Sequence, residues 1–152
     1  MTLRDDLKAK TITAMKEKNE GRLMILRSMS AALKDADIAA RTKGNQDGID
    51  EKEIMALFQS MIKKRNDSIE MYKQGGRQDL ADKEQAQIAV LEEFLPKQLS
   101  EADMEKVIKE TITKIGAASV KDMGKIMATL KENYTGQMDF SKASNIIKAA
   151  LA

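Results

Sequence analysis

The segment LEEFLPKQL, residues 91–99, determines how the rest of this chain is organised. It contains Pro96, the single proline among 152 residues, at the end of a long helical pattern. Proline lacks an amide hydrogen, its ring clashes with the preceding helical turn, and it disfavours helical angles at Leu95. We therefore predict a joint here, with an N-terminal helical domain over residues 1–95 and a C-terminal helical domain over residues 96–152.

Upstream of the joint, apolar residues recur at helical spacing in four segments, at about residues 3–18, 22–40, 51–74 and 79–94. The short connections favour antiparallel neighbours in a bundle or in hairpins. The exception is RTKGNQDGID, residues 41–50, which is polar and contains two glycines. This composition predicts a flexible, disordered loop.

The same spacing predicts which side chains are buried. On the first helix, the predicted apolar face consists of Leu3, Leu7, Ile12 and Met15. Polar residues are expected on outer faces, including Arg22 and Asp37 on the second helix and the basic run at residues 63–65 on the third.

Downstream of the joint, three shorter helices are expected. Ser100, Ser119 and Asp139 are the predicted N-caps, and Gly116 and Gly136 follow the ends of the first two helices. Aromatic residues make up only 3% of the chain, so the cores must be largely aliphatic. The predicted fold class is all-α: an N-terminal set of antiparallel helices followed by a small three-helix tail domain.

Composition narrows the range of functions. The chain has no His and no Cys, so the commonest general base and the usual zinc ligands are absent. Its glycines form no phosphate-binding loop. We therefore expect no cofactor, no metal and no enzyme that acts alone. The polar N-terminus, the lack of Cys and the lack of a long apolar run predict a cytoplasmic protein without a membrane segment.

Charge is distributed unevenly along the chain. Residues 1–95 contain 17 basic and 17 acidic side chains, whereas residues 106–152 contain eight lysines and four acids. Lysine contacts phosphate as a point charge, so such binding is independent of nucleotide sequence and weakens with salt. The alternative is a solvated helix surface. The predicted phosphate contacts are Lys121, Lys125, Lys131, Lys142 and Lys148.

A second hypothesis is a protein-interaction module. Leu95, Pro96 and Leu99 would form an apolar groove between the domains that receives a helix of a partner. Salt distinguishes the two hypotheses, because phosphate contacts weaken steeply with salt and an apolar groove hardly responds. Glu92 and Glu93 resemble a catalytic or metal-binding acid pair, but nothing brings further ligands to them, and we interpret them as surface residues.

Several dispersed motifs resemble the YqeY-like family. They are Arg22-Leu23 with Leu26-Arg27, residues 63–68 with Tyr72, the segment from Arg77 to Glu84, and Phe94-Leu95-Pro96-x-Gln98-Leu99. The C-terminal part is similar to the tail domain of the B subunit of aspartyl/glutamyl-tRNA amidotransferase. That similarity is carried by residues 123–127, Gly136, Asp139, residues 145–148 and Leu151. The chain departs from the pattern after Gly136, where Gln137 replaces the usual Lys or Arg.

The resemblance implies a helical N-terminal part and a tail domain that helps to hold tRNA. In the amidotransferase, a separate cradle domain activates the acyl group and a partner subunit supplies ammonia from glutamine. This chain resembles neither of those parts. The expected function is therefore a non-catalytic protein that binds tRNA or associates with a protein of the amidation or translation machinery. The alternative is an accessory to a carbon–nitrogen ligase that uses glutamine as its amide donor.

Overall fold

The computed structural model describes residues 2–151, which contain seven α-helices, one short 3-10 helix and no strand. The predicted all-α class is therefore confirmed. The chain divides into two compact units, one that ends at Leu95 and one that begins at Pro96. We refer to them as the N-terminal unit and the C-terminal unit and describe each by itself.

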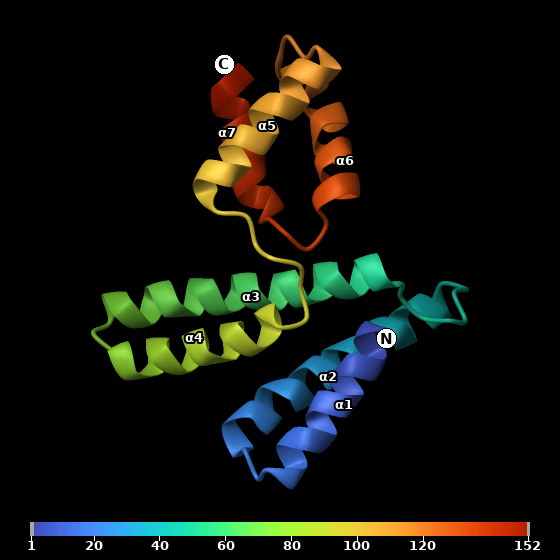
Figure 1. Cartoon of the computed structure of the whole chain (residues 1–152), viewed down its shortest axis with the longest axis vertical. Helices are drawn as coiled ribbons and strands as arrows, with labels where there is room; N and C mark the ends of the chain where they lie inside the picture. The colour runs from blue at the N-terminus through green and yellow to red at the C-terminus, as the bar shows by residue number, and fades with distance from the viewer. Residues whose placement is uncertain (1, 152) are drawn as a thin grey trace. The chain divides into compact units, whose positions relative to one another are not determined.

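The N-terminal unit consists of two helical hairpins (Figure 1). In the first hairpin, α1 (Leu3–Lys16) packs against α2 (Glu20–Thr42). In the second, α3 (Glu51–Gln74) packs along α4 (Gln78–Glu92). The hairpins are joined mainly through α2, which also contacts both α3 and α4.

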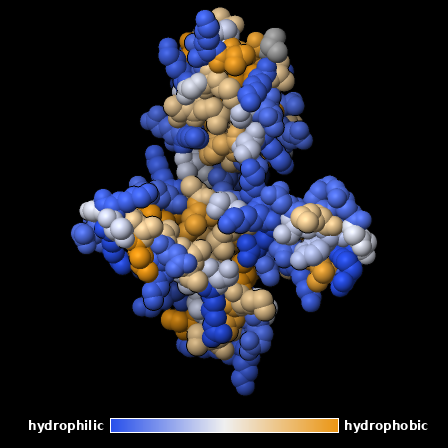
Figure 2. Space-filling model, turned by 180° about the vertical axis from the view of Figure 1, so that it is seen from behind, coloured by the Kyte–Doolittle hydropathy of each residue, from blue (hydrophilic) through white to orange (hydrophobic). Residues whose placement is uncertain are grey.

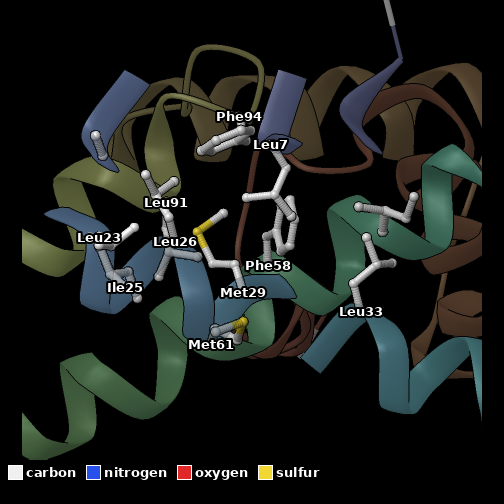
Figure 3. Packing of buried hydrophobic residues seen from close by; sticks show 12 residues of the cluster. Leu7, Leu23, Ile25, Leu26, Met29, Leu33, Phe58, Met61, Leu91 and Phe94 are labelled. Atoms are coloured by element: carbon white, nitrogen blue, oxygen red, sulfur yellow. The ribbon is translucent and has the colours of Figure 1, made fainter. Parts of the chain in front are cut away.

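The core of the N-terminal unit lies where the two hairpins meet. Phe58 of α3 is fully buried there, among Leu26 and Met29 of α2 and Leu91 of α4 (Figure 3). Phe94 packs edge-on against Phe58, with 5.8 Å between the ring centroids. Apart from these two aromatic rings, the cluster is aliphatic or methionine, as the composition predicts.

Side-chain caps begin α1 and α3 at the predicted residues, whereas α2 begins at Glu20, two residues before its predicted start. The hydroxyl of Thr2 accepts a bond from the amide of Asp5, and the Asp5 carboxylate accepts one from the amide of Thr2, which is a reciprocal capping box. Asn19 caps α2 through one bond, accepted from the backbone amide of Arg22, and Asp50 caps α3 by accepting from the backbone amide of Glu53. These side chains satisfy amides that have no partner inside the helix.

The predicted apolar face of α1 is only half right. Leu7 is buried, but the side chains of Ile12 and Met15 are 44% and 52% exposed, and Ala14 is buried instead. Ile12 is five residues after Leu7 and so lies about 140° around the helix, whereas Ala14 is seven residues after it and returns to nearly the same side. Figure 2 shows such apolar residues (orange) at the surface of the N-terminal unit.

The connection between α2 and α3 is packed, which contradicts the predicted disorder of residues 41–50. The amide of Ile49 donates to the Asp37 carboxylate at 3.0 Å, and the carbonyl of Ile49 accepts from Arg4 at 2.8 Å. Gly48 is buried with φ +82°, and a Cβ at this position would lie 2.3 Å from an oxygen of Asp37. Gly48, one of the two glycines on which the prediction of flexibility rested, is therefore required by the packing against Asp37.

The C-terminal unit is a small three-helix domain built from α5 (Glu101–Ile115), α6 (Met123–Tyr134) and α7 (Phe140–Leu151). The 3-10 turn η1 (Val120–Asp122) precedes α6. Ser100 caps α5 by accepting from Asp103, and Gly116 ends it in the left-handed conformation with φ +73°. The largest fully buried side chains of its core are those of Ile108, Ile126, Leu130, Met138 and Ile147.

The turn between α6 and α7 is held by the segment that follows Pro96. The amide of Leu99 donates to the carbonyl of Gln137 at 2.8 Å, and the side-chain amide of Gln98 donates to the carbonyl of Gly136. Gln98 and Leu99 therefore stabilise the α6–α7 turn within the C-terminal unit.

Candidate functional site

All five lysines predicted to contact phosphate are exposed. Among residues 2–151, none of them is within ion-pair distance of an acid, and every ion pair formed there lies in the N-terminal unit. Two nearby acids instead bond to the backbone: Asp122 accepts from the amide of Ala118, and Asp139 accepts from the amide of Ser141. The positive charge of this unit is therefore available to a ligand.

The topology sorts these lysines into two groups. Because α6 and α7 are antiparallel and joined by a short turn, the start of α6 lies at the same end of the unit as the close of α7 (Figure 1). That end brings together Lys121, Lys125 and Lys148, and the last turn of α5 adds Lys114, which the sequence prediction omitted. We call these four residues the basic end. Lys131 lies toward the opposite end.

Lysines on one helix do not form a single stripe. Lys125 and Lys131 are six residues apart, and so are Lys142 and Lys148, which places the members of each pair about 120° apart around their helix. Lys142, like Lys131, lies near the α6–α7 turn. A phosphate backbone can therefore follow the basic end more easily than it can contact all five predicted residues at once.

The C-terminal unit presents no aromatic stacking platform at the residue that sequence analysis considered. Tyr134, the one aromatic residue that sequence analysis considered for stacking, is half-buried and packs against the hydrophobic core. No group of three or more acidic residues within residues 2–151 could hold a metal ion. None of the helices in that range is long and apolar enough to cross a membrane.

The residues of the predicted partner groove contribute to different cores. Leu95 packs against the core of the N-terminal unit, and Leu99 packs against the core of the C-terminal unit. Pro96 is exposed. A partner groove formed by these three residues stays a prediction.

A polar cluster that the sequence did not predict links α1, α2 and the connection to α3. The Arg4 guanidinium donates to both oxygens of Asp37, at 2.6 and 2.7 Å. Asp37, expected on an outer face, is only 6% exposed. The two bonds from Arg4 lower the pKa of Asp37 to about 2, against the opposing effect of burial and with help from the amide of Ile49. Asp37 is therefore a buried, fully ionised carboxylate at neutral pH.

Beside this cluster, an open groove of about 380 Å³ runs between α1 and α2. Leu7 and Leu33 form its floor, and Lys8, Lys34 and Arg41 lie along its rims. We call it the α1–α2 groove. Among the described residues that line it, Asp37 is the sole acid and is already paired with Arg4.

Comparison with known protein families finds one model, described as Yqey-like protein, that matches residues 4–151. The match covers both units. The chain belongs to the YqeY-like family.

Three curated relatives of this YqeY-like chain share the name "Altered inheritance of mitochondria protein 41, mitochondrial". The protein of Saccharomyces cerevisiae is 31% identical over 126 residues, which cover 78% of this chain. That of Lachancea thermotolerans is 24% identical, over 98% of this chain and 76% of its own length. That of Pyrenophora tritici-repentis is 29% identical, over 82% of this chain and 69% of its own length. The match spans 63% of the Saccharomyces protein, just under two thirds of its length.

The names of these relatives contradict the prediction of a cytoplasmic protein, because they describe mitochondrial proteins. The prediction was wrong in its reasoning as well. A chain without Cys forms no disulfides, but this absence does not distinguish one reducing compartment from another.

Several residues that carried the YqeY-like resemblance have structural roles. Arg22, expected on an outer face, donates to both oxygens of Glu93 at 2.6 and 2.9 Å and so joins α2 to the end of α4. This contact lowers the pKa of Glu93, to which Lys10 of α1 also contributes. Arg65 turns toward α4, where it donates to Gln87 at 2.9 Å instead of lying on an outer face. These motifs therefore stabilise the hairpin packing of the family fold.

Proposed function

We propose that this YqeY-like chain is a non-catalytic RNA-binding protein that associates with tRNA or with tRNA-dependent amidation. The observation that carries the proposal is the basic end, where lysines from α5, η1, α6 and α7 converge without acidic partners among the described residues. By contrast, the arginines Arg4, Arg22 and Arg77 of the N-terminal unit are paired with carboxylates.

The chemistry of the basic end suits the phosphate backbone and not the bases. Lysine ammonium groups neutralise phosphates and release counterions, which gives affinity without sequence preference. The planar, bidentate contacts that read base edges come from arginine, and the last arginine in the chain is Arg77. Specificity for tRNA would then come from the shape of the RNA or from a partner.

The choice of tRNA rests on the similarity of the C-terminal unit to the tail domain of the amidotransferase B subunit. Gly136 belongs to that similarity, whereas Gln137 replaces the usual Lys or Arg. The backbone carbonyls of both residues accept hydrogen bonds, from the side-chain amide of Gln98 and the backbone amide of Leu99 respectively. The turn therefore supports the fold of the unit, and the phosphate contacts are assigned to the lysines.

Charge reversal at the basic end tests the proposal. In the full chain, Lys121, Lys125 and Lys148 are changed together to Glu, and binding of labelled bulk tRNA is followed by fluorescence anisotropy at low salt. The expected result is an affinity loss of at least about tenfold, because three phosphate contacts are replaced by repulsion. Circular dichroism checks that the helices are retained.

The matched control changes three exposed lysines of the N-terminal unit, Lys52, Lys73 and Lys83, to Glu. It alters net charge by the same amount and should weaken binding by less than about threefold. Equal losses in the two triple variants would mean that net charge alone drives binding, and would refute the assignment to the basic end.

A further inference from the structure

We propose that the α1–α2 groove binds an acidic amphipathic helix of a partner protein. The groove lies wholly in the N-terminal unit and is independent of the lysines assigned to RNA. The inference rests on the shape of the groove, on the charges along its rims and on the apolar residues left exposed beside it.

The rims of the groove carry like charges that face each other. The contact between Arg4 and Asp37 fixes the register of the antiparallel helices. Lys8 is one turn further along α1, and Lys34 is about one turn back along α2, so these two ammonium groups lie on opposite rims. Neither forms an ion pair with a residue in the range 2–151. A carboxylate placed between them would remove a repulsion and form two ion pairs.

The lining as a whole is positive. Four basic residues line the groove against Asp37 alone, which leaves a balance of +3. Arg4 is committed to Asp37, and the Nε atom of Arg41 donates to the carbonyl of Gln46 at 3.3 Å. The terminal nitrogens of Arg41 stay available to a ligand. Charge complementarity therefore selects an acidic occupant.

The floor of the groove adds an apolar requirement. Leu7 and Leu33 lie beneath the basic rims, and Ile12 at one edge is 44% exposed. Ile38 is half-exposed on the same helix as Lys34 and Arg41. An occupant that complements both the apolar floor and the basic rims has apolar side chains on one face and carboxylates along its flanks.

The dimensions favour a helix of a few turns. The lining extends from Arg4 to Ile12 on α1 and from Ser30 to Arg41 on α2, which corresponds to about 12 and 16 Å along the helix axes. A third helix laid between two antiparallel helices presents side chains at every third or fourth residue to such a groove. The described part of the chain has no strand, so no sheet edge invites an extended peptide.

Other polyanions fit the groove less well. No aromatic residue lines it, so the bases of a single-stranded RNA would meet an aliphatic floor without a stacking platform. A lipid surface is flat and would reach the rims but leave the concave floor uncovered. A partner helix satisfies the rims and the floor together.

The test uses the full chain and a fluorescein-labelled peptide of about 14 residues, with Leu at helical spacing on one face and Glu at the remaining positions. A second peptide keeps this composition in scrambled order, and a third replaces every Glu by Lys. The expected result is binding of the first peptide only, measured by fluorescence anisotropy. Equal binding of the scrambled peptide, or failure of the first peptide to bind at low salt, would overturn the proposal.

Variants assign the binding to the groove. Changing Lys8 and Lys34 together to Glu should weaken binding of the acidic peptide by at least about tenfold. The matched pair Lys52→Glu with Lys83→Glu, on exposed positions of α3 and α4, should change it by less than about threefold. Equal effects of the two pairs would overturn the proposal.

The apolar layer has its own control. Ile12→Ser should weaken binding several-fold, whereas Met71→Ser, at an exposed methionine of α3, should leave it unchanged. Circular dichroism verifies that each variant stays helical. Two further outcomes would assign the groove to another occupant and overturn the proposal: binding to phosphatidylglycerol vesicles that is lost in the Lys8, Lys34 variant, or a dimer in light scattering that Ile12→Ser dissociates.

Discussion

Replacing Asp37 by Asn tests how the N-terminal unit is held together. Asn has the same shape as Asp but cannot balance the charge of Arg4. A pKa lowered from 3.8 to about 2 is a shift of nearly two units, and at about 1.4 kcal/mol per unit the ionised form is favoured in the folded state by about 2.5 kcal/mol. The side chain of Arg4 is 36% exposed, so water can solvate its charge in part when the Asp37 carboxylate is lost. We expect a loss of about 2 kcal/mol at neutral pH.

The pH dependence gives this prediction its sign. The folded-state pKa of Asp37 is depressed, so its contribution to stability is complete above 3.8 and is lost as the pH falls toward about 2. The difference between the wild type and Asp37→Asn should therefore shrink over that interval.

Urea unfolding measures the effect in a Tyr134→Phe background, where Tyr72 is the remaining tyrosine and reports on the N-terminal unit. The matched control is Asp35→Asn, at an exposed position of α2, which should cost less than about 0.5 kcal/mol. Equal costs for the two substitutions, or a cost for Asp37→Asn that does not change with pH, would refute the reasoning.

Three further substitutions test other parts of the structure. Gly48→Ala should destabilise the N-terminal unit by about 1–2 kcal/mol more than Gly44→Ala, as measured by urea unfolding of the two variants. Both positions have positive φ, but only at Gly48 would the new Cβ meet Asp37. Glu93→Gln should cost about 1 kcal/mol or less, since this carboxylate is partly exposed, and the cost should fall further at high salt. Ile108→Ala should destabilise the C-terminal unit by about 2–5 kcal/mol, with Tyr134 fluorescence in a Tyr72→Phe background as the readout. In the Tyr134→Phe background, a shift of the unfolding transition reported by Tyr72 would contradict the division into two units.

The sequence predicts most of the fold because its strongest signals are local. Thr2 and Ser100 cap helices through bonds to amides three residues away, so their roles can be predicted from short segments. Gly116 ends α5 by adopting a conformation that other residues avoid. These features need no knowledge of the tertiary structure.

The errors arise where the partner is distant in the sequence. Asp37 was predicted to lie on the surface because its partner, Arg4, is 33 positions away in the sequence. Arg65 was also predicted to lie on the surface, because its partner Gln87 is 22 positions away on another helix. The connection at Gly48 was predicted to be flexible because its order depends on Asp37 and Arg4, which composition does not reveal.

The candidate site was predictable in its residue type but not in its arrangement. An excess of lysine after residue 106 is visible in the sequence. That Lys121, Lys125 and Lys148 share one end of the unit follows only from the antiparallel packing of α6 and α7 and the position of η1 beside α7. The α1–α2 groove was missed altogether, because a spacing argument assigned Ile12 to the core.

The most direct test of the RNA-binding proposal is the salt dependence of tRNA binding by the full chain. If three lysines contact phosphates, raising the salt fourfold, from about 50 to about 200 mM, should weaken binding by about 20- to 40-fold. In the Lys121, Lys125, Lys148→Glu variant, this dependence should largely disappear together with the affinity. No binding at low salt, or binding that salt does not change, would contradict the proposal.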